Sequence, residues 1–240
     1  MTKILDDIQL KNAAAFDDVF EHVRKLTMVP QQQLFATWAF AIRLIEENVK
    51  GDFAEFGVWR GGCSFGLALI QRAVFGSVVR PVWMFDSFQG LPAVDVRDGL
   101  AAAAYQRDTE SPRYFDNCRA SYQEAVDHRA VFNLAEIDAR LIQGWFHDTV
   151  PQHVLNLQAN GLALMRVDCD WYAPVRFVLD QLDPLVNTGG VVILDDYYKW
   201  DGCSRATHDF MSRRAHAYRL RELGEELAAY YIKSDGAQSA

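Results

Sequence analysis

The fold is decided by residues 53–64, which read FAEFGVWRGGCS. A short apolar run that carries an acid, Glu55, is followed by a turn with three glycines and then by the start of an apolar helical pattern. Glycine lets a ligand approach the backbone closely, and the free N–H groups at the start of a helix favour an anionic group. Because the glycines lack the G-x-G-x-x-G spacing, the dinucleotide-binding interpretation is weakened. A simple tight turn between a strand and a helix is the alternative interpretation.

Strands and helices alternate outward from this turn along the chain. The expected helices cover residues 12–25, 31–48, 64–74, 114–128, 174–185 and 203–214, and the expected strands cover 52–56, 81–85, 140–143, 162–167, 190–194, 218–222 and 227–233. Such alternation predicts an α/β fold with a mostly parallel seven-stranded sheet covered by helices on both faces. The last two strands are joined by a short turn at residues 224–226, so we expect them to form an antiparallel hairpin at the sheet edge.

The length of 240 residues predicts a single domain, residues 1–240. Residues 1–49 would supply N-terminal helices that precede the first strand. Residues 87–133 form an unusually long connection between strands, and connections of this length often cover a functional site or contain a helix of their own. We therefore expect an insertion, or lid, at residues 87–133.

Composition and charge exclude several classes of protein. The formal net charge is −8 without a cluster of Lys or Arg, which argues against a nucleic-acid partner and favours a small molecule. The first ten residues lack the apolar run of a signal peptide, and no stretch has the length of a membrane span, so we expect a cytoplasmic protein without membrane association. The four cysteines and six histidines show no spacing typical of zinc sites or of a disulfide framework.

An acid also closes the second expected strand. Asp86 follows Glu55 by 31 residues, at the place where a carboxylate in this topology commonly accepts hydrogen bonds from two ribose hydroxyls. The alternative is an ordinary solvated aspartate in a turn. A glycine turn and an acid on adjacent strands together indicate a cofactor that contains a nucleoside.

Pairs of carboxylates follow two later strands. Asp168 and Asp170 close one strand, and Asp195 and Asp196 close the next. Because the carboxyl ends of parallel strands meet at one edge of the sheet, we expect these acids to converge near the cofactor. Carboxylates so close need a cation, and oxygen-only ligands favour Mg²⁺. Separate solvated acids are the alternative. Four aromatic residues follow the acids and suit a ring-shaped acceptor such as a sugar or a phenol: Trp171, Tyr197, Tyr198 and Trp200.

Five sequence blocks in this order resemble the macrocin O-methyltransferase family. They are EFGVWRGG at 55–62, FDSFQGLP at 85–92, GWF at 144–146, Asp168-x-Asp170-x-Tyr172 and DDY at 195–197. The resemblance spans residues 27–232. It implies a Rossmann-like class I methyltransferase fold, S-adenosylmethionine and Mg²⁺ as cofactors, a sugar hydroxyl of a natural product as acceptor, and a homo-oligomer. This chain differs from the usual family pattern at Cys63, Cys169 and Trp171.

The resemblance also implies roles for individual residues. Gly57 and Ser64 would line the methionine end of the cofactor, covered by Thr27 and Met28, and Asp86 would hold the ribose. The adenine would lie between Trp145 and Phe146, and the segment after Pro92 would form the acceptor lid and part of a subunit contact. The metal ligands would be Asp168, Asp195 and Asp196. The complete set of candidate cofactor-binding residues is Thr27, Met28, Glu55, Gly57, Ser64, Asp86, Ser87, Gly144, Trp145, Phe146 and Asp168.

The expected chemistry is the activation of a weakly nucleophilic hydroxyl by the metal and a carboxylate base. Asp168 is the first candidate for the base. Asp170 is the second, because residues two apart in an extended segment point to the same side. The competing interpretations are a metal-dependent glycosyltransferase that uses the D-x-D motif, a nicotinamide oxidoreductase and a non-catalytic nucleoside-binding module.

Overall fold

The structure, a computed structural model, describes residues 2–214, 218–224 and 228–234, and its centre is one seven-stranded sheet. The strand order is β3-β2-β1-β4-β5-β7-β6. The bounds are β1 Asp52–Phe56, β2 Val82–Asp86, β3 Ala139–Gln143, β4 Leu162–Val167, β5 Val186–Leu194, β6 Arg221–Leu223 and β7 Ala228–Ile232. Strands β1 to β5 are parallel, whereas β7 runs antiparallel to both β5 and β6. The predicted sheet and its edge hairpin are therefore confirmed, although residues 225–227 of the hairpin turn lie outside the described residues.

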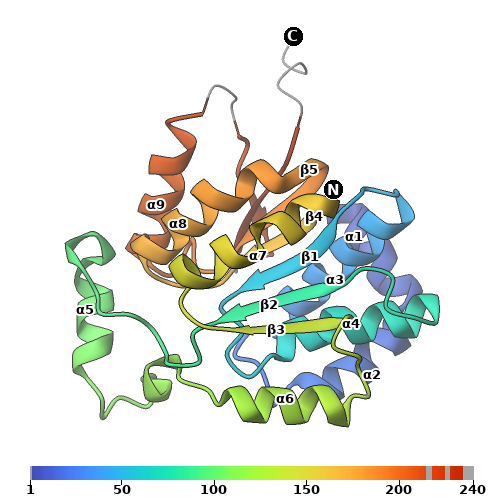
Figure 1. The fold of residues 1–240 in the computed structure, drawn as a ribbon, viewed down its shortest axis with the longest axis horizontal. Coiled ribbons are helices and arrows are strands. Elements are labelled where there is room, and N and C mark those ends of the chain that lie inside the picture. Colours follow the sequence, from blue (N-terminus) through green and yellow to red (C-terminus); the bar gives the residue numbers. More distant parts are fainter. Residues whose placement is uncertain (1, 215–217, 225–227, 235–240) are drawn as a thin grey trace.

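Helices cover both faces of this sheet (Figure 1). One face carries α1 Thr2–Lys11, α2 Ala13–Val23, α3 Gln31–Glu46 and α4 Gly62–Phe75, and the other carries α7 Phe146–Asn160, α8 Tyr172–Leu182 and α9 Asp201–Met211. Side chains alternate between the faces along each strand. On β1, Phe53 joins the core under α2, α3 and α4, whereas Ala54 joins the core under α7, α8 and α9.

The first helix was not among the predicted elements. In α1 only two apolar side chains, Leu5 and Ile8, are buried, whereas Ile4 and Leu10 are exposed. A helix with so few buried positions carries a weak periodic signal in the sequence. The predicted helices at 12–25 and 31–48 correspond to α2 and α3, each ending about two residues earlier than expected.

The insertion, residues 87–133, contains two helices, α5 Gly99–Arg107 and α6 Tyr122–Val131. The predicted helix at 114–128 was wrong in its start, because residues 115–118 all have positive φ angles, between 43° and 57°. Residues other than glycine rarely adopt this left-handed conformation, and it interrupts a helix. The helix begins only after Ser121, whose side chain accepts a hydrogen bond from the Glu124 N–H. Helix α5, which contains an alanine-rich run, was not predicted.

The insertion is anchored to the main body, although Figure 1 shows α5 to the side of the sheet. The Asp98 carboxylate, 2% exposed, accepts a hydrogen bond of 2.6 Å from the Tyr172 N–H at the start of α8. The Trp171 indole N–H donates to the carbonyl of Pro92 at 3.1 Å. The Tyr105 ring of α5 packs against Trp171 and Trp200. These contacts fix the insertion to the residues that follow β4 and β5.

Candidate active site

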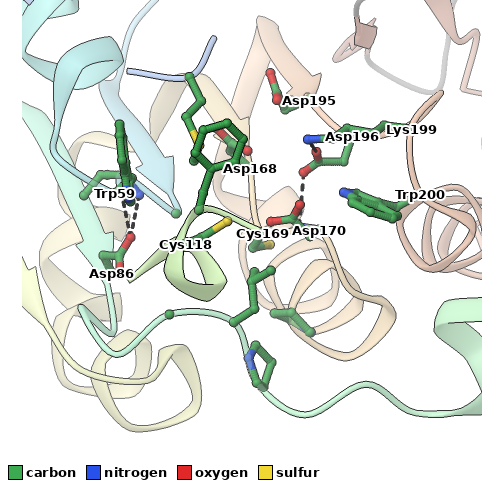
Figure 2. Close-up of a pocket in the computed structure, with 18 of the residues that line it drawn as sticks. Trp59, Asp86, Cys118, Asp168, Cys169, Asp170, Asp195, Asp196, Lys199 and Trp200 are labelled. Atoms are coloured by element: carbon green, nitrogen blue, oxygen red, sulfur yellow. Dashed lines mark hydrogen bonds and ion pairs between the residues drawn. The ribbon is translucent and has the colours of Figure 1, made fainter. Parts of the chain in front are cut away.

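A cavity of about 1490 Å³ opens at the carboxyl ends of the parallel strands. Its wall combines the glycine turn, the ends of β2, β4 and β5, the segment before α3, and the insertion (Figure 2). The structure brings most of the predicted site residues to this one wall: Thr27, Met28, Glu55, Gly57, Asp86, Ser87, Trp145, Phe146, Asp168, Asp170, Asp195 and Asp196. Their convergence follows from the parallel topology, because the ends of parallel strands meet at one edge.

Two predicted cofactor-contact residues are not among the residues that line this cavity. Ser64 is fully buried and donates a hydrogen bond to Glu55, while the adjacent Cys63 lines the cavity. Gly144 donates its N–H to the carbonyl of Asp86 at 2.9 Å, while the adjacent Trp145 lines the cavity. Neither Ser64 nor Gly144 is among the residues that line the cavity, and their roles in cofactor binding stay predictions.

The glycines of the turn accommodate the protein's own backbone. Gly57 has φ +91°, and a Cβ atom there would lie 1.7 Å from the carbonyl oxygen of Asp168, so a side chain would separate the ends of β1 and β4. A Cβ atom on Gly62 would lie 2.6 Å from the backbone of Leu26. The Gly62 N–H donates to the Leu26 carbonyl at 2.9 Å, so this helix-start group is occupied by the protein. The double glycine therefore brings Thr27 and Met28 to the cavity.

Asp86 holds the glycine turn and also lines the cavity. Its Oδ2 accepts hydrogen bonds from the N–H groups of Val58 and Trp59 at 2.8 and 2.9 Å (Figure 2). Its Oδ1 accepts one from the N–H of Phe88 at 2.6 Å. Burial raises the pKa of this carboxyl group, and the three backbone donors oppose that rise. A carboxylate has about four acceptor positions. Asp86 therefore keeps capacity for a further donor from a ligand.

A fully buried arginine, Arg166, lies behind the predicted metal ligands. Its guanidinium forms ion pairs with Asp168, Asp195 and Glu55, the last with an Nη1–Oε1 distance of 2.9 Å. Burial disfavours the charged guanidinium, but the surrounding carboxylates outweigh this and raise the pKa of Arg166. Burial raises the pKa of Glu55, and Arg166 opposes that rise.

The three predicted metal ligands converge. One carboxylate oxygen from each of Asp168, Asp195 and Asp196 lies within 4.8 Å of the others. Burial raises the pKa of both Asp195 and Asp196, and the neighbouring aspartates raise it further. The described cluster contains two cationic side chains, Arg166 and Lys199, and five carboxyl groups, those of Glu55, Asp168, Asp170, Asp195 and Asp196. An excess of oxygen donors and negative charge fits a hard divalent cation such as Mg²⁺.

The second acid of the D-x-D motif, Asp170, does not lie in an extended segment. Its φ angle is 55°, and the next residue, Trp171, donates its N–H to the Cys169 carbonyl at 2.6 Å. The premise that Asp168 and Asp170 point to the same side of an extended strand was therefore wrong. Instead, the Asp170 N–H donates to Asp196 at 3.1 Å, and Figure 2 shows Asp170 below Asp196 and beside Trp200. Burial raises the pKa of Asp170 to about 7.

The aromatic residues after the acids have different positions. Tyr198 and Trp200 line the cavity. Trp171 is 1% exposed and anchors the insertion, and the Tyr197 hydroxyl lies 2.9 Å from Nε2 of His208 on α9. Only part of the predicted aromatic surface therefore faces the cavity.

Three residues of the site were missed in the sequence. Arg166 is one of them, and a charged residue inside an otherwise apolar strand was a signal, because a buried charge must be paired. Gln33 of α3, 2% exposed, donates to Asp195, and Lys199 lies 3.8 Å from Asp196. No signal in the sequence points to Gln33, because its contact spans 162 positions of the chain.

Comparisons with known proteins identify the family of this chain. The family model described as Macrocin-O-methyltransferase (TylF) matches residues 9–232. A demethyldecarbamoylnovobiocin O-methyltransferase of Streptomyces niveus is 35% identical over 170 residues, which are 71% of this chain and 62% of that protein. An 8-demethyl-8-(2,3-dimethoxy-alpha-L-rhamnosyl)-tetracenomycin-C 4'-O-methyltransferase of Streptomyces olivaceus is 33% identical over 170 residues, which are 71% of this chain and 61% of that protein. The chain thus spans less than two thirds of the length of these two relatives.

Solved structures are also similar to this chain. The O-methyltransferase NovP has a TM-score of 0.72 and 31% identity, covering 88% of this chain and 83% of its own. The calicheamicin methyltransferase CalS11 has a TM-score of 0.64 at 21% identity, covering 94% of this chain and 93% of its own, which shows the shared fold. The sheet is therefore that of the Rossmann-like class I methyltransferases. No helix in the described part of the chain is long and apolar enough to cross a membrane. On the family match and these relatives, the chain belongs to the macrocin O-methyltransferase family.

Proposed function

We propose that this protein transfers the methyl group of S-adenosylmethionine to a hydroxyl group of a sugar on a natural product, with the help of Mg²⁺. The observation that carries the proposal is that the glycine turn with Asp86 and the cluster of Asp168, Asp195 and Asp196 share one cavity. Family membership supports the reaction type, and the name of the S. olivaceus relative specifies a rhamnosyl tetracenomycin as the methylated compound. Neither a glycosyltransferase nor a nicotinamide oxidoreductase is supported by these relatives.

The cofactor would bind at the glycine turn. Thr27, Met28 and Gly57 line the cavity there, and Asp86 has acceptor capacity for one further donor, which a ribose hydroxyl would supply. Trp145 and Phe146, at the start of α7, line the same cavity and offer apolar surface for the adenine. When bound, S-adenosylmethionine supplies the methyl group. The electrons of the broken carbon–sulfur bond stay on sulfur, and the new bond forms between the methyl carbon and the acceptor oxygen.

The metal would be held by Asp168, Asp195 and Asp196, which fit a cation by their charge and by the approach of their oxygens. When bound, Mg²⁺ supplies a Lewis acid that lowers the pKa of the acceptor hydroxyl. Gln33 and Arg166 hold the ligand Asp195 from the side of α3 and β4. The chain's own contribution here is a set of ligands with fixed positions.

Within this proposal, Asp170 is better placed than Asp168 to accept the proton of the acceptor hydroxyl. Both acids line the cavity, but Asp168 is paired with Arg166. The pKa of Asp170, about 7, is close to the value that favours a general base at neutral pH. The positive φ angle of Asp170 is the kind of strained backbone that clusters at functional sites.

The acceptor would occupy the part of the cavity walled by the insertion. Cavities for one drug-sized ligand measure about 300–1,000 Å³. The volume of about 1490 Å³ therefore has room for both the cofactor and an acceptor. Ala104 and Tyr105 from α5, Phe177 from α8 and Trp200 also line the cavity. We also propose that the protein is located in the cytoplasm and forms a homo-oligomer.

Transfer of a labelled methyl group tests the proposed function. The purified protein is incubated with S-adenosylmethionine labelled in the methyl group, Mg²⁺ and a panel of glycosylated natural products, their aglycones and non-glycosylated phenols. Label on the sugar of at least one glycoside, and on none of the aglycones, is the expected result. Label confined to phenols would make the protein a phenol methyltransferase. Absence of binding to S-adenosylhomocysteine in a parallel calorimetric titration would contradict the methyltransferase function itself.

A further inference from the structure

The register of the central strands places Arg166 on the same face of the sheet as the two carboxylates it contacts across strands. Arg166 of β4 lies opposite Glu55 of β1 and opposite Ile193 of β5. Because side chains alternate, Asp195, two residues after Ile193, continues the face on which Arg166 lies. Asp168 follows Arg166 by two residues. The arginine therefore contacts residues from the ends of both β4 and β5 on this face.

The contacts of the guanidinium are divided between its two terminal nitrogens. Nη1 donates to Oδ2 of Asp168 and to Oε1 of Glu55, and Nη2 donates to Oδ1 of Asp195. One oxygen of each aspartate is thus bound to Arg166, which leaves the second oxygen of each for another partner. The Asp168 and Asp195 side chains are 23% and 15% exposed toward the cavity, whereas Arg166 is 0% exposed.

Two buried carboxylates from neighbouring strands repel one another unless a cation lies between them. A guanidinium is planar and presents its donors in a rigid fork, so it can hold two carboxylates at a fixed separation. An ammonium group is a point charge on a flexible chain and lacks this geometry. Arg166 therefore supplies both the charge and the geometry that the two aspartates need before any metal is bound.

We propose that Arg166 is a positioning residue that holds Asp168 and Asp195 at the separation required for a divalent cation, so that the metal site is formed before the metal arrives. The inference rests on the proposed Mg²⁺ role of these aspartates. Arg166 itself does not touch the metal, the cofactor or the acceptor. Its side chain acts from behind the ligands, on the side of the sheet covered by α3.

A role of Arg166 by charge alone and a role by position predict opposite changes in Mg²⁺ affinity when the arginine is removed. If the arginine acted only by its charge, its removal would lower the positive potential at the site and tighten the binding of Mg²⁺. If it acts by position, its removal weakens Mg²⁺ binding, because the two aspartates lose their fixed separation. A lysine at this position separates the two effects, since it keeps the charge and loses the fork.

The test is a calorimetric titration of MgCl₂ into the chelator-treated full chain, without acceptor, for the wild type, Arg166→Lys and Arg166→Met. Lys233→Met is the matched control, because it also removes a cation from a buried carboxylate, that of Asp183, before the start of β5. We expect the dissociation constant for Mg²⁺ to rise at least about fivefold in Arg166→Lys and about tenfold in Arg166→Met. We expect it to stay unchanged in Lys233→Met, with melting temperatures lowered in all three variants.

An Mg²⁺ dissociation constant within twofold of the wild type, or a tighter one, in a folded Arg166→Lys variant would overturn the inference. If neither arginine variant folds, Arg166 serves the fold rather than the metal site and the inference is wrong. Absence of saturable Mg²⁺ binding by the wild type would overturn the proposed metal role together with the inference. If the wild type binds Mg²⁺ and the arginine variants bind it with the same dissociation constant, the inference is overturned but the proposed metal role is not.

Discussion

Two buried carboxylate clusters flank β5, and they differ in charge balance. Before the strand, Asp183 accepts hydrogen bonds from the Tyr218 and Tyr231 hydroxyls at 3.0 and 2.9 Å and pairs with Lys233. After the strand, the Arg166 cluster combines five carboxyl groups with two cationic side chains. The first cluster has one charge of each sign, and each carboxylate oxygen has a partner. The second has a surplus of negative charge beside a cavity.

The difference separates a structural cluster from a functional one. A buried carboxylate with matched donors fixes one packing arrangement, here the attachment of β7 and its flanking residues to β5. A buried surplus of carboxylates is unfavourable by itself and is stabilised by a further cation. Both clusters contain fully buried carboxyl groups, so burial alone does not identify the site. Charge balance does, and each of the following experiments probes that difference.

Removal of the metal has the largest expected effect. Treatment with EDTA followed by desalting should abolish methyl transfer, and Mg²⁺ should restore it, because the acceptor hydroxyl then loses its Lewis acid. Methyl transfer to the acceptor found in the labelling screen is the measurement. Full turnover after exhaustive chelation would show that the carboxylate surplus is not a catalytic metal site.

Asp170→Asn tests the proposed base. The amide keeps the shape of the side chain but cannot accept a proton, so turnover should fall at least about 100-fold. The affinities for S-adenosylhomocysteine and for Mg²⁺ should stay within about twofold of the wild type. Asp168→Asn is the comparison variant and should lose Mg²⁺ affinity as well as turnover. Normal turnover in Asp170→Asn would remove this residue as the proton acceptor.

Asp86→Ala should weaken S-adenosylhomocysteine binding about tenfold or more, because a charged acceptor of hydrogen bonds is typically worth about 1.5–3 kcal/mol. The same change leaves the N–H groups of Val58, Trp59 and Phe88 without their acceptor, so the melting temperature should also fall. Asp86→Asn, which keeps the size of the side chain, controls for this loss. An unchanged dissociation constant in both folded variants would show that Asp86 serves only the turn.

The pH dependence of stability should show the smallest effect. The pKa values of Asp170, Asp195 and Asp196 are raised by burial in the metal-free protein. The folded state therefore binds protons between about pH 4 and 7 that the unfolded chain has released, so stability falls as the pH rises through this window. The metal-free melting temperature should be at least about 2 °C higher at pH 6 than at pH 8. Saturating Mg²⁺ should remove this difference, whereas a metal-free melting temperature that is lower at pH 6 would contradict the assigned pKa shifts.

The sequence predicted the features that depend on chain order. The glycine turn at 53–64, the acids at 86, 168, 195 and 196, and the parallel strands were sufficient to place these acids at one edge of the sheet. Features that depend on strand register and on the packing of helices against the sheet were missed. The role of Arg166 can be inferred only once Glu55 is known to lie opposite it on the neighbouring strand. The role of Gln33 can be inferred only once α3 is known to cover that face of the sheet. The turn at Asp170 depends on contacts after both β4 and β5, so the D-x-D motif alone indicated a false extended geometry.

Direct observation of the metal tests the central claim, that the carboxylate surplus after β4 and β5 is a cation site. Crystals of the protein with S-adenosylhomocysteine are soaked with Mn²⁺, which takes the same oxygen ligands as Mg²⁺ and can be located by its anomalous scattering. The predicted result is one strong peak at about 2.0–2.3 Å from a carboxylate oxygen of each of Asp168, Asp195 and Asp196, and no peak at Asp183. A cluster that stays without a peak at saturating Mn²⁺, or a peak only elsewhere on the protein, would contradict the claim.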